Sequence, residues 1–231
     1  MIRLENIGKR YKDLTVLDRI DWRIEDAAFV LVTGRSGGGK TTLLSIMGGL
    51  TRPDEGKVFI DDVDIWRLSE PDLAALRNRK LGFVFQFPSL IPTLRVLDNV
   101  LLPIAFSGRT PDREDRESAL SLLGMVGITG KEDAYPSQLS GGQQRRVAIA
   151  RAMINRPSVI LADEPTGDLD ETTEAEIMGL FQRINRQGVL VVMVTHALDY
   201  SSFGTPYLLK NQQVLPYEGE SSPKGAKSGA S

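Results

Sequence analysis

The sequence predicts an α/β fold in which helices cover both faces of a parallel sheet. Four short apolar segments, at 27–33, 81–85, 159–162 and 189–194, have the length of buried strands, and mostly helical stretches lie between them. The first of these strands runs directly into a glycine-rich segment and a helix. The stretch from 88 to 155 is mostly helical, which predicts a lobe inserted into the sheet domain.

Composition favours an ordinary globular protein with one full core. The chain has 231 residues, 41% of them hydrophobic and 25% charged. Its 28 Lys and Arg balance 30 Asp and Glu, which argues against a nucleic-acid partner bound through a basic face. Cysteine is absent, so a disulfide framework and a thiolate metal site are excluded, and a reducing cytosol is compatible.

No segment has the pattern of a membrane span or a signal peptide. The N-terminal residues 1–6 lack an apolar core region. The longest aliphatic run, at 189–194, falls far short of the ~20 residues that cross a bilayer. We therefore expect a cytoplasmic chain that reaches a membrane only through a partner.

Local signals place several element boundaries. Apolar and charged residues alternate over 20–24, as in a half-buried strand, and Asp61-Asp62 is typical of a hairpin turn. Ser69 and Asp72 have the spacing of a helix cap.

Three further segments have recognisable local patterns. Thr110-Pro111 predicts a helix start in the inserted lobe, because proline suits the first helical position. A later amphipathic helix carries apolar residues at helical spacing over 177–184. The polar segment 216–231 is predicted to be disordered.

The glycine-rich run at 34–41, GRSGGGKT, fits the phosphate-binding pattern G-x-x-x-x-G-K-[ST]. Its backbone N–H groups would cradle phosphates, Lys40 would reach the β- and γ-phosphates, and the Thr41 hydroxyl would hold Mg²⁺. A flexible glycine turn is the plain alternative, which the strand–loop–helix order disfavours. We assign nucleotide binding to Gly34, Ser36, Gly37, Gly38, Gly39, Lys40, Thr41 and Thr42.

Two acidic residues follow the apolar strand at 159–162. We expect this strand to lie next to the one that feeds the glycine run. Asp163 would then bind Mg²⁺ through water, and Glu164 would act as general base for the attacking water. Solvated acids often end strands, so the pair gains its weight from the phosphate loop.

A second glycine-rich run, Leu139-Ser140-Gly141-Gly142-Gln143, precedes Asp163-Glu164 by about twenty residues. Together these motifs resemble the nucleotide-binding subunit of an ABC transporter, over roughly residues 2–215. The resemblance implies an ABC ATPase of the P-loop NTPase class, with a RecA-like parallel-sheet core and an antiparallel β subdomain. It also implies one domain over 1–215, with the core at about 1–87 and 156–215 and the helical subdomain at about 88–155.

The resemblance also implies roles for single residues, some of which are ambiguous on their own. Gln86 matches the glutamine that contacts Mg²⁺ and the nucleophilic water, although a loop glutamine is usually only polar surface. His196, the only histidine, matches the switch histidine at the γ-phosphate, and Ala197 stands where relatives often have Asp. Tyr11 matches the aromatic that stacks on adenine, but tyrosines at such positions are as often core or surface.

The signature run is expected to bind the ATP held by the opposite subunit. A serine cap and free N–H groups at a helix N-terminus favour an anion, which agrees with this role. Asp170 is placed across the dimer interface. The contacts to that ATP are assigned to Ser140, Gly141, Gly142, Gln143 and Asp170. For Arg145 and Arg146, in the helix that follows, a solvated helix face is favoured over nucleic-acid contact.

The implied machine is a homodimer with ATP and Mg²⁺ between its subunits, driving a separate membrane permease from the cytoplasmic face. Loop segments resemble one branch of the family, which contains the lipoprotein-releasing and macrolide-exporting ATPases. These segments are FQF at 85–87, LIP at 90–92, LDNV at 97–100 and LADEPTG at 161–167. Phe87, Leu90 and Ile91 are hypothesised to line the groove where a permease helix docks.

Three alternatives stay open at this point. A regulatory ATPase of the cell-division type, which signals through a membrane partner, would carry the same catalytic residues. A translation factor or DNA-repair ATPase would need a second cassette or a long coiled-coil insertion, and neither is present. A small-molecule kinase could use the same phosphate loop but would not need the signature run at 139–143.

Overall fold

Residues 1–196 and 199–217 are described by the computed structural model. They form two sheets. The smaller sheet is antiparallel, with strand order β2-β1-β4-β5. Its strands are β1 (Ile2–Tyr11), β2 (Leu14–Ile24), β4 (Glu55–Ile60) and β5 (Val63–Asp64). The predicted turn at Asp61-Asp62 is confirmed. Both residues have positive φ, 48° and 64°, as the type I′ turn of a two-residue hairpin loop requires.

The larger sheet has six strands in the order β10-β9-β3-β8-β7-β6. All pairs are parallel except β9 with the edge strand β10. The strands are β3 (Phe29–Gly34), β6 (Leu81–Val84), β7 (Val159–Asp163), β8 (Leu190–Val194), β9 (Thr205–Lys210) and β10 (Gln213–Pro216). The expectation that β7 lies next to β3 is wrong, because β8 is inserted between them.

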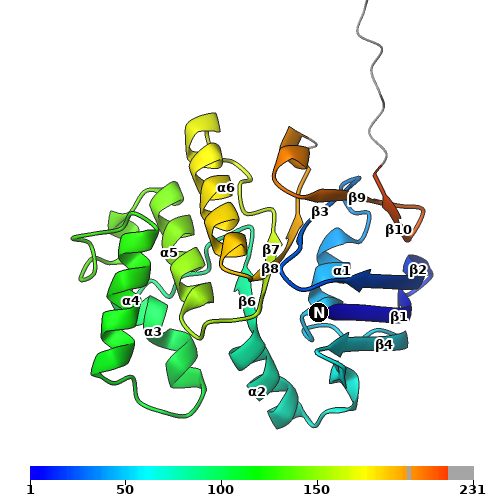
Figure 1. Ribbon diagram of the computed structural model, residues 1–231, viewed down its shortest axis with the longest axis horizontal. Coiled ribbons are helices and arrows are strands. Elements are labelled where there is room, and N and C mark those ends of the chain that lie inside the picture. The colour runs from blue at the N-terminus through cyan, green and yellow to red at the C-terminus, as the bar shows by residue number, and fades with distance from the viewer. Residues whose placement is uncertain (197–198, 218–231) are drawn as a thin grey trace, which may run out of the picture.

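Helices cover both faces of the larger sheet (Figure 1). Helix α6 and the helical lobe of α3, α4 and α5 lie on one side, and α1 with the antiparallel sheet lies on the other. The helices are α1 (Lys40–Met47), α2 (Glu70–Lys80), α3 (Val96–Phe106), α4 (Arg113–Met125), α5 (Gly141–Met153) and α6 (Glu171–Arg186). Short 3₁₀ turns stand at Ile65–Arg67, Pro136–Gln138 and Asp199–Ser202.

Two apolar cores result from the alternation of side chains along the strands. In β3, Leu31 packs into the core under the helical lobe, while Val30 and Val32 pack into the core around α1. The predicted amphipathic helix is confirmed as α6, with Ile177 and Phe181 fully buried. The larger sheet therefore separates two apolar cores, and its carboxyl edge can hold functional groups.

The helix starts show where sequence signals compete. Helix α2 begins after Ser69, whose Oγ accepts a bond from Asp72 N at 3.3 Å, as predicted. Helix α4 begins at Arg113, not at the predicted Thr110-Pro111. Asp112 and Asp115 form a reciprocal capping box there, which satisfies two orphan N–H groups instead of one.

The C-terminal end of the described chain continues further as strand than predicted. Pro216, the first residue of the predicted disordered segment, is the last residue of β10 and pairs with Tyr207. Residues 218–231 of that segment, and Ala197, lie outside the described residues. Among the residues that the structure describes, no helix has the length and apolar character of a membrane span.

Candidate nucleotide site

The glycine-rich run forms the connection from β3 to α1 at the carboxyl edge of the sheet. Gly39 precedes α1 with φ 96°, in the left-handed region that favours glycine. A Cβ at this position would stand 2.5 Å from Val16 Cγ1 of β2. The antiparallel sheet thus supports the loop from behind, and only glycine fits where loop and strand meet.

Lys40 is folded back onto the loop. Its Nζ donates to the carbonyl oxygens of Gly34 at 3.0 Å and Arg35 at 3.1 Å. The residue is 5% exposed, and burial lowers the pKa of its ammonium, while the charges of Glu164 and Asp163 raise it. Two backbone carbonyls of the glycine-rich run therefore hold the Lys40 side chain inside the loop.

Thr41 of α1 and Asp163 of β7 are in contact, although β3, the strand that precedes α1, is not a neighbour of β7. Helix α1 crosses the sheet face and contacts both β7 and β8. As a result, Thr41 Oγ1 donates to Asp163 Oδ1 at 3.2 Å. Burial raises the pKa of Asp163, and the bond from Thr41 opposes that rise. A hydroxyl and a carboxylate are hard oxygen donors, which Mg²⁺ prefers.

Glu164 follows β7 and is paired with the switch position. His196 Nε2 lies 2.7 Å from Glu164 Oε1. The backbone N–H of Glu164 donates to Val194 O at 2.9 Å, which ties the residue to the end of β8. Glu164 has φ 46°, an unusual left-handed conformation for a residue with a side chain. The structure therefore brings Lys40, Thr41, Asp163, Glu164 and His196 to one edge of the sheet.

Among the described residues, Gln86 and Tyr11 make no hydrogen bond to this group. Gln86 follows β6, and its Nε2 would lie 3.9 Å from a Cβ placed on Gly167, in the turn after Glu164. Tyr11 ends β1 with its side chain 48% exposed and the Lys9 Nζ 5.4 Å from the ring centroid. A pocket of about 520 Å³ beside the loop is lined by 14–16 of β2, and Tyr11 does not line it.

The signature run begins α5. Ser140 Oγ accepts a bond from Gln143 N at 3.3 Å, and Gln143 Oε1 accepts one from Ser140 N at 3.1 Å. These bonds form a capping box, so the predicted serine cap is confirmed. A Cβ at Gly142 would stand 2.7 Å from Thr173 Cγ2 of α6. Ser140 and Gly141 are exposed, so this helix N-terminus is open to a second molecule.

Asp170 acts locally as the cap of α6. Its carboxylate accepts bonds from the backbone N of Thr173 at 3.0 Å and from the Thr173 hydroxyl at 2.6 Å. These bonds, the side-chain bond first, hold the pKa of Asp170 below its usual value. The residue is also exposed, and its place across a dimer interface stays a prediction.

The prediction of a solvated helix face is wrong for Arg145, whereas Arg146 keeps part of its side chain exposed. Arg145 is 6% exposed, and its guanidinium donates to backbone carbonyls in the turn that follows Glu164. Arg146 is partly buried, pairs with Glu176 of α6 and donates to Val126 O at 3.2 Å. A sequence signal for Arg145 existed, because it lies four residues before buried Ile149 and so on the same side of α5.

An apolar groove of about 1100 Å³ runs between α2, β6 and α3. Of the three residues hypothesised to line a permease-docking groove, Ile91 lines this one. Leu90 packs against the core under the helical lobe, and Phe87 is exposed outside the groove. Phe85 and Phe106, which the sequence analysis did not place in a groove, are exposed aromatic residues that line it.

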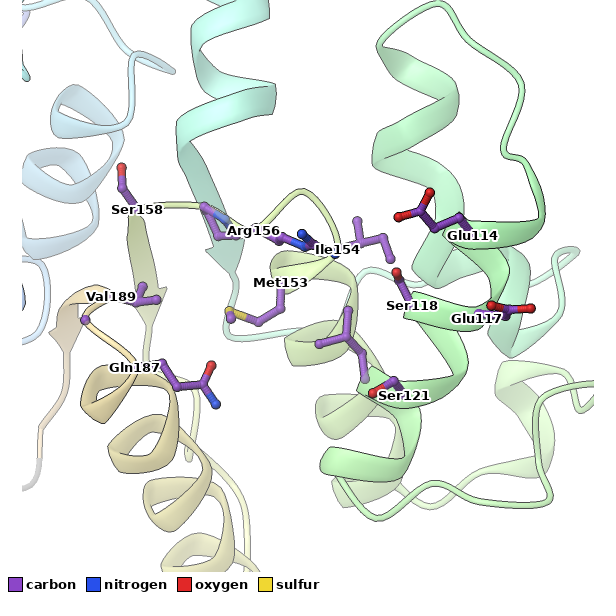
Figure 2. Close-up of a pocket in the computed structure, with 13 residues that line it drawn as sticks. Glu114, Glu117, Ser118, Ser121, Met153, Ile154, Arg156, Ser158, Gln187 and Val189 are labelled. Carbon is purple, nitrogen blue, oxygen red and sulfur yellow. The ribbon is translucent and has the colours of Figure 1, made fainter.

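A different pocket, of about 670 Å³, lies at the opposite edge of the sheet. Figure 2 shows it between α4 and the segments that precede β7 and β8, with Ser158 and Val189 at the strand starts. None of the predicted site residues lines this pocket. The predicted site residues that the structure brings together lie instead at the carboxyl edge of the sheet, where the glycine-rich run and the acidic end of β7 meet.

Comparison with known proteins agrees with this geometry. The family model for ABC transporters matches residues 17–167. The lipoprotein-releasing system ATP-binding protein LolD of Aquifex aeolicus is 45% identical over 196 residues, which cover 85% of this chain and 87% of LolD. The macrolide export ATP-binding/permease protein MacB of Syntrophobacter fumaroxidans is 46% identical over 202 residues, which cover 85% of this chain. That match spans only 28% of MacB.

Solved structures show the same architecture. The ATP-binding cassette MJ0796 of Methanocaldococcus jannaschii, solved as a dimer in a post-hydrolysis state bound to ADP and Pi, superposes with a TM-score of 0.85. The two are 42% identical, and the match covers 93% of this chain and 96% of that chain. The predicted class, an α/β ATPase with a parallel core, an antiparallel sheet and a helical region, is confirmed. The chain belongs to the ABC transporter ATP-binding family, and its chemistry is ATP hydrolysis.

Proposed function

We propose that two copies of this chain close over two ATP molecules and that this stroke drives a separate membrane permease. The observation that carries the proposal is the Glu164–His196 pair at 2.7 Å, beside the Thr41–Asp163 bond and the phosphate loop. A base, its orienting partner, an oxygen-ligand pair and a phosphate cradle are the parts that phosphoanhydride hydrolysis needs.

Each residue has a role that its position supports. Lys40 leaves its carbonyl partners in the loop for the β- and γ-phosphate oxygens of ATP. Glu164 accepts a proton from the attacking water. His196, which pairs with the Glu164 carboxylate, holds that carboxylate in line with the γ-phosphate. Gln86 completes this set from the loop after β6.

Asp163, Thr41 and Gln86 would hold Mg²⁺. Bound there with the nucleotide, Mg²⁺ would neutralise charge on the β- and γ-phosphates. Among the described residues no cluster of three or more His, Cys, Asp or Glu could hold a metal ion. A site with one carboxylate fits Mg²⁺, because this ion usually takes further oxygens from substrate phosphates and water.

The exposed start of α5 supports the proposed dimer. Ser140, Gly141 and Gly142 would bind the γ-phosphate of an ATP held by Lys40 of the partner subunit. The adenine of that ATP would stack on Tyr11 of the partner subunit. Asp170 would lie across the same interface. The dimeric cassette of known structure supports this arrangement. Because only the γ-phosphate contacts both surfaces, ATP favours the closed dimer. Hydrolysis removes this contact, and the dimer opens.

The substitution Glu164→Gln tests hydrolysis and dimerisation together. We expect the variant to bind ATP and to accumulate as a dimer in light scattering, with turnover reduced by about 10²-fold or more. Glu117→Gln, on an exposed face of α4, is the matched control and should keep parent activity. A Glu164→Gln variant that turns over ATP like the parent would show that the general base lies elsewhere.

We further propose that the groove of Phe85, Ile91 and Phe106 receives a permease helix, which holds the chain at the cytoplasmic face of the membrane. Exposed aromatic rings around a large apolar groove are typical of a docking surface. Similarity to lipoprotein-releasing and macrolide-exporting proteins favours transport over a purely regulatory role.

Co-purification with the co-expressed permease tests docking. Phe106→Asp places a charge in the groove and should abolish co-purification while ATP binding persists. Leu120→Asp is the matched control, because Leu120 is an exposed apolar residue of α4 outside the groove. Equal permease recovery with both variants would exclude the groove as the docking surface.

A further inference from the structure

One buried guanidinium links the signature helix to the catalytic turn of the same subunit. Arg145 Nη1 donates to Pro165 O at 2.7 Å and to Glu164 O at 3.2 Å, and Nη2 donates to Gly167 O at 3.3 Å. Arg145 lies only five residues after Ser140, in the second turn of α5. A single side chain therefore contacts the backbone of the general base and of two residues that follow it.

The turn that Arg145 binds has an unfavourable backbone. Glu164 and Asp168, at its two ends, have φ of 46° and 61°, in the left-handed region that L side chains rarely adopt. Such a conformation persists where the surroundings hold it in place. With its carbonyls bound to Arg145, the turn cannot relax to an ordinary conformation without breaking charge-assisted hydrogen bonds.

Among the described residues, the other hydrogen bonds of this turn do not reach the signature helix. The Thr166 hydroxyl lies 3.3 Å from the hydroxyl of Tyr200, which follows the switch histidine. Glu164 N is bound by Val194 O of β8, and Gly167 N is bound by Glu164 O inside the turn. These bonds fix the turn to the sheet domain, whereas Arg145 fixes it to the helical lobe.

Burial makes the link firm. Arg145 is 6% exposed, and within the described part of the chain its Nε has no hydrogen-bond partner. A buried cation is costly unless its donors are used, so the guanidinium cannot leave the three carbonyls without losing its compensation. Movement of the start of α5 is therefore transmitted to the Glu164 backbone.

We propose that Arg145 is a positioning residue that couples the two ATP sites of the dimer. This inference rests on the proposed function, in which Ser140 and Gly142 contact the ATP of the partner while Glu164 acts on the ATP of its own subunit. When the signature run engages one ATP, Arg145 places Glu164 for hydrolysis of the other. The communication runs through the first turns of α5 and one side chain.

The substitution Arg145→Met removes all the donors and keeps most of the length. ATP affinity, measured with a fluorescent analogue, should stay within about twofold, because Lys40 and the phosphate loop are unchanged. The kcat of hydrolysis should fall by about 10–10²-fold, the effect of misplacing a catalytic group by about 1 Å. The Hill coefficient for ATP should fall towards one, because the sites would no longer communicate.

Arg146→Met is the matched control on the same helix. It removes the bonds to Glu176 and Val126, and among the described residues Arg146 has no hydrogen bond to the catalytic turn, so kcat and the Hill coefficient should match the parent. Arg145→Lys keeps a cation that cannot span three carbonyls. It should recover part of the kcat, and it provides the same comparison should the Met variant fail to fold.

Three results would overturn the inference. These are parent kcat and Hill coefficient in both Arg145 variants, equal losses in Arg146→Met, or a loss of ATP affinity that accounts for the whole change. Failure of the proposed function is distinguishable, because it would appear in Glu164→Gln alone as absence of the ATP-dependent dimer. The double variant Glu164→Gln/Arg145→Met should still dimerise with ATP, since its signature residues are intact.

Discussion

His196 Nε2 and Glu164 Oε1 lie 2.7 Å apart, although 32 positions of sequence and the whole of α6 and β8 separate the two residues. The contact exists because β7 and β8 are parallel neighbours whose carboxyl ends meet at one edge. Glu164 follows the first strand, and His196 follows the second by two residues. The pair is thus positioned by sheet topology.

The first prediction concerns this pair. His196→Ala should lower kcat by roughly 10²-fold, because the Glu164 carboxylate loses the partner that orients it. ATP affinity should change little, since Lys40 and the phosphate loop are unaltered. Steady-state kinetics beside equilibrium ATP binding separate the two quantities. Parent kcat in His196→Ala would mean that the contact has no role in turnover.

The second prediction concerns the buried carboxyl of Asp163. Burial raises its pKa above the usual 3.8, so the folded state holds the proton more tightly than the unfolded state does. Stability from this group is therefore lost as pH rises through the raised pKa. Asp163→Asn does not titrate and should have a higher Tm than the parent at pH 7, with the difference shrinking towards pH 3.

The same variant tests the metal role in a separate measurement. Mg²⁺ with ATP should raise the Tm of the parent, because a ligand that binds only the folded state stabilises it. In Asp163→Asn the additional rise from Mg²⁺ over ATP alone should be lost. An unchanged Mg²⁺ effect would place the metal ligand on another residue.

The third prediction concerns Gly39. Gly39→Ala meets two penalties, the left-handed φ of 96° and a Cβ 2.5 Å from Val16 Cγ1. Together they should destabilise the fold by about 1–3 kcal/mol and weaken ATP binding. Adding Val16→Ala removes the contact with Cγ1, whereas the left-handed φ and the 3.2 Å approach to Val16 O remain, so the double variant should recover stability in part. Urea denaturation of the parent, the two single variants and the double variant measures the coupling free energy between the two positions. Full recovery of stability in the double variant would mean that the left-handed φ has no energetic cost.

The fourth prediction concerns the start of α4. The Arg109 side chain, and then the backbone N of Asp112, lower the pKa of Asp115 from 3.8 to about 2. A lowered pKa gives stability that is present above pH 3.8 and is lost as pH falls towards 2. Asp115→Asn should therefore have a lower Tm than the parent at pH 7, and the two should converge near pH 2. A constant difference across this range would contradict the assignment of the shift.

Periodicity and local motifs predicted the elements that depend on neighbouring residues. The alternation at 20–24, the cap at Ser69 and the helical spacing at 177–184 all lie within a few positions, and each appears in the structure. The start of α4 was misplaced because two capping signals overlap within six residues, and the reciprocal one at Asp112 and Asp115 prevails.

Relationships between distant segments could not be obtained in this way. The position of β8 between β3 and β7 depends on how the crossover connections run, and the local pattern of each strand does not encode it. Arg145 resembled surface in the sequence, because a charged residue is usually exposed. It is buried because the carbonyls of a strained turn, far along the chain, satisfy its guanidinium.

The sequence alone determined the type of chemistry, because phosphate-binding loops, metal-binding oxygens and helix caps are formed by residues within a few positions of one another. Only tertiary structure decided which of these runs meet and which groups hold them. Backbone hydrogen bonding across the parallel sheet and burial in two cores act between residues that local sequence does not relate.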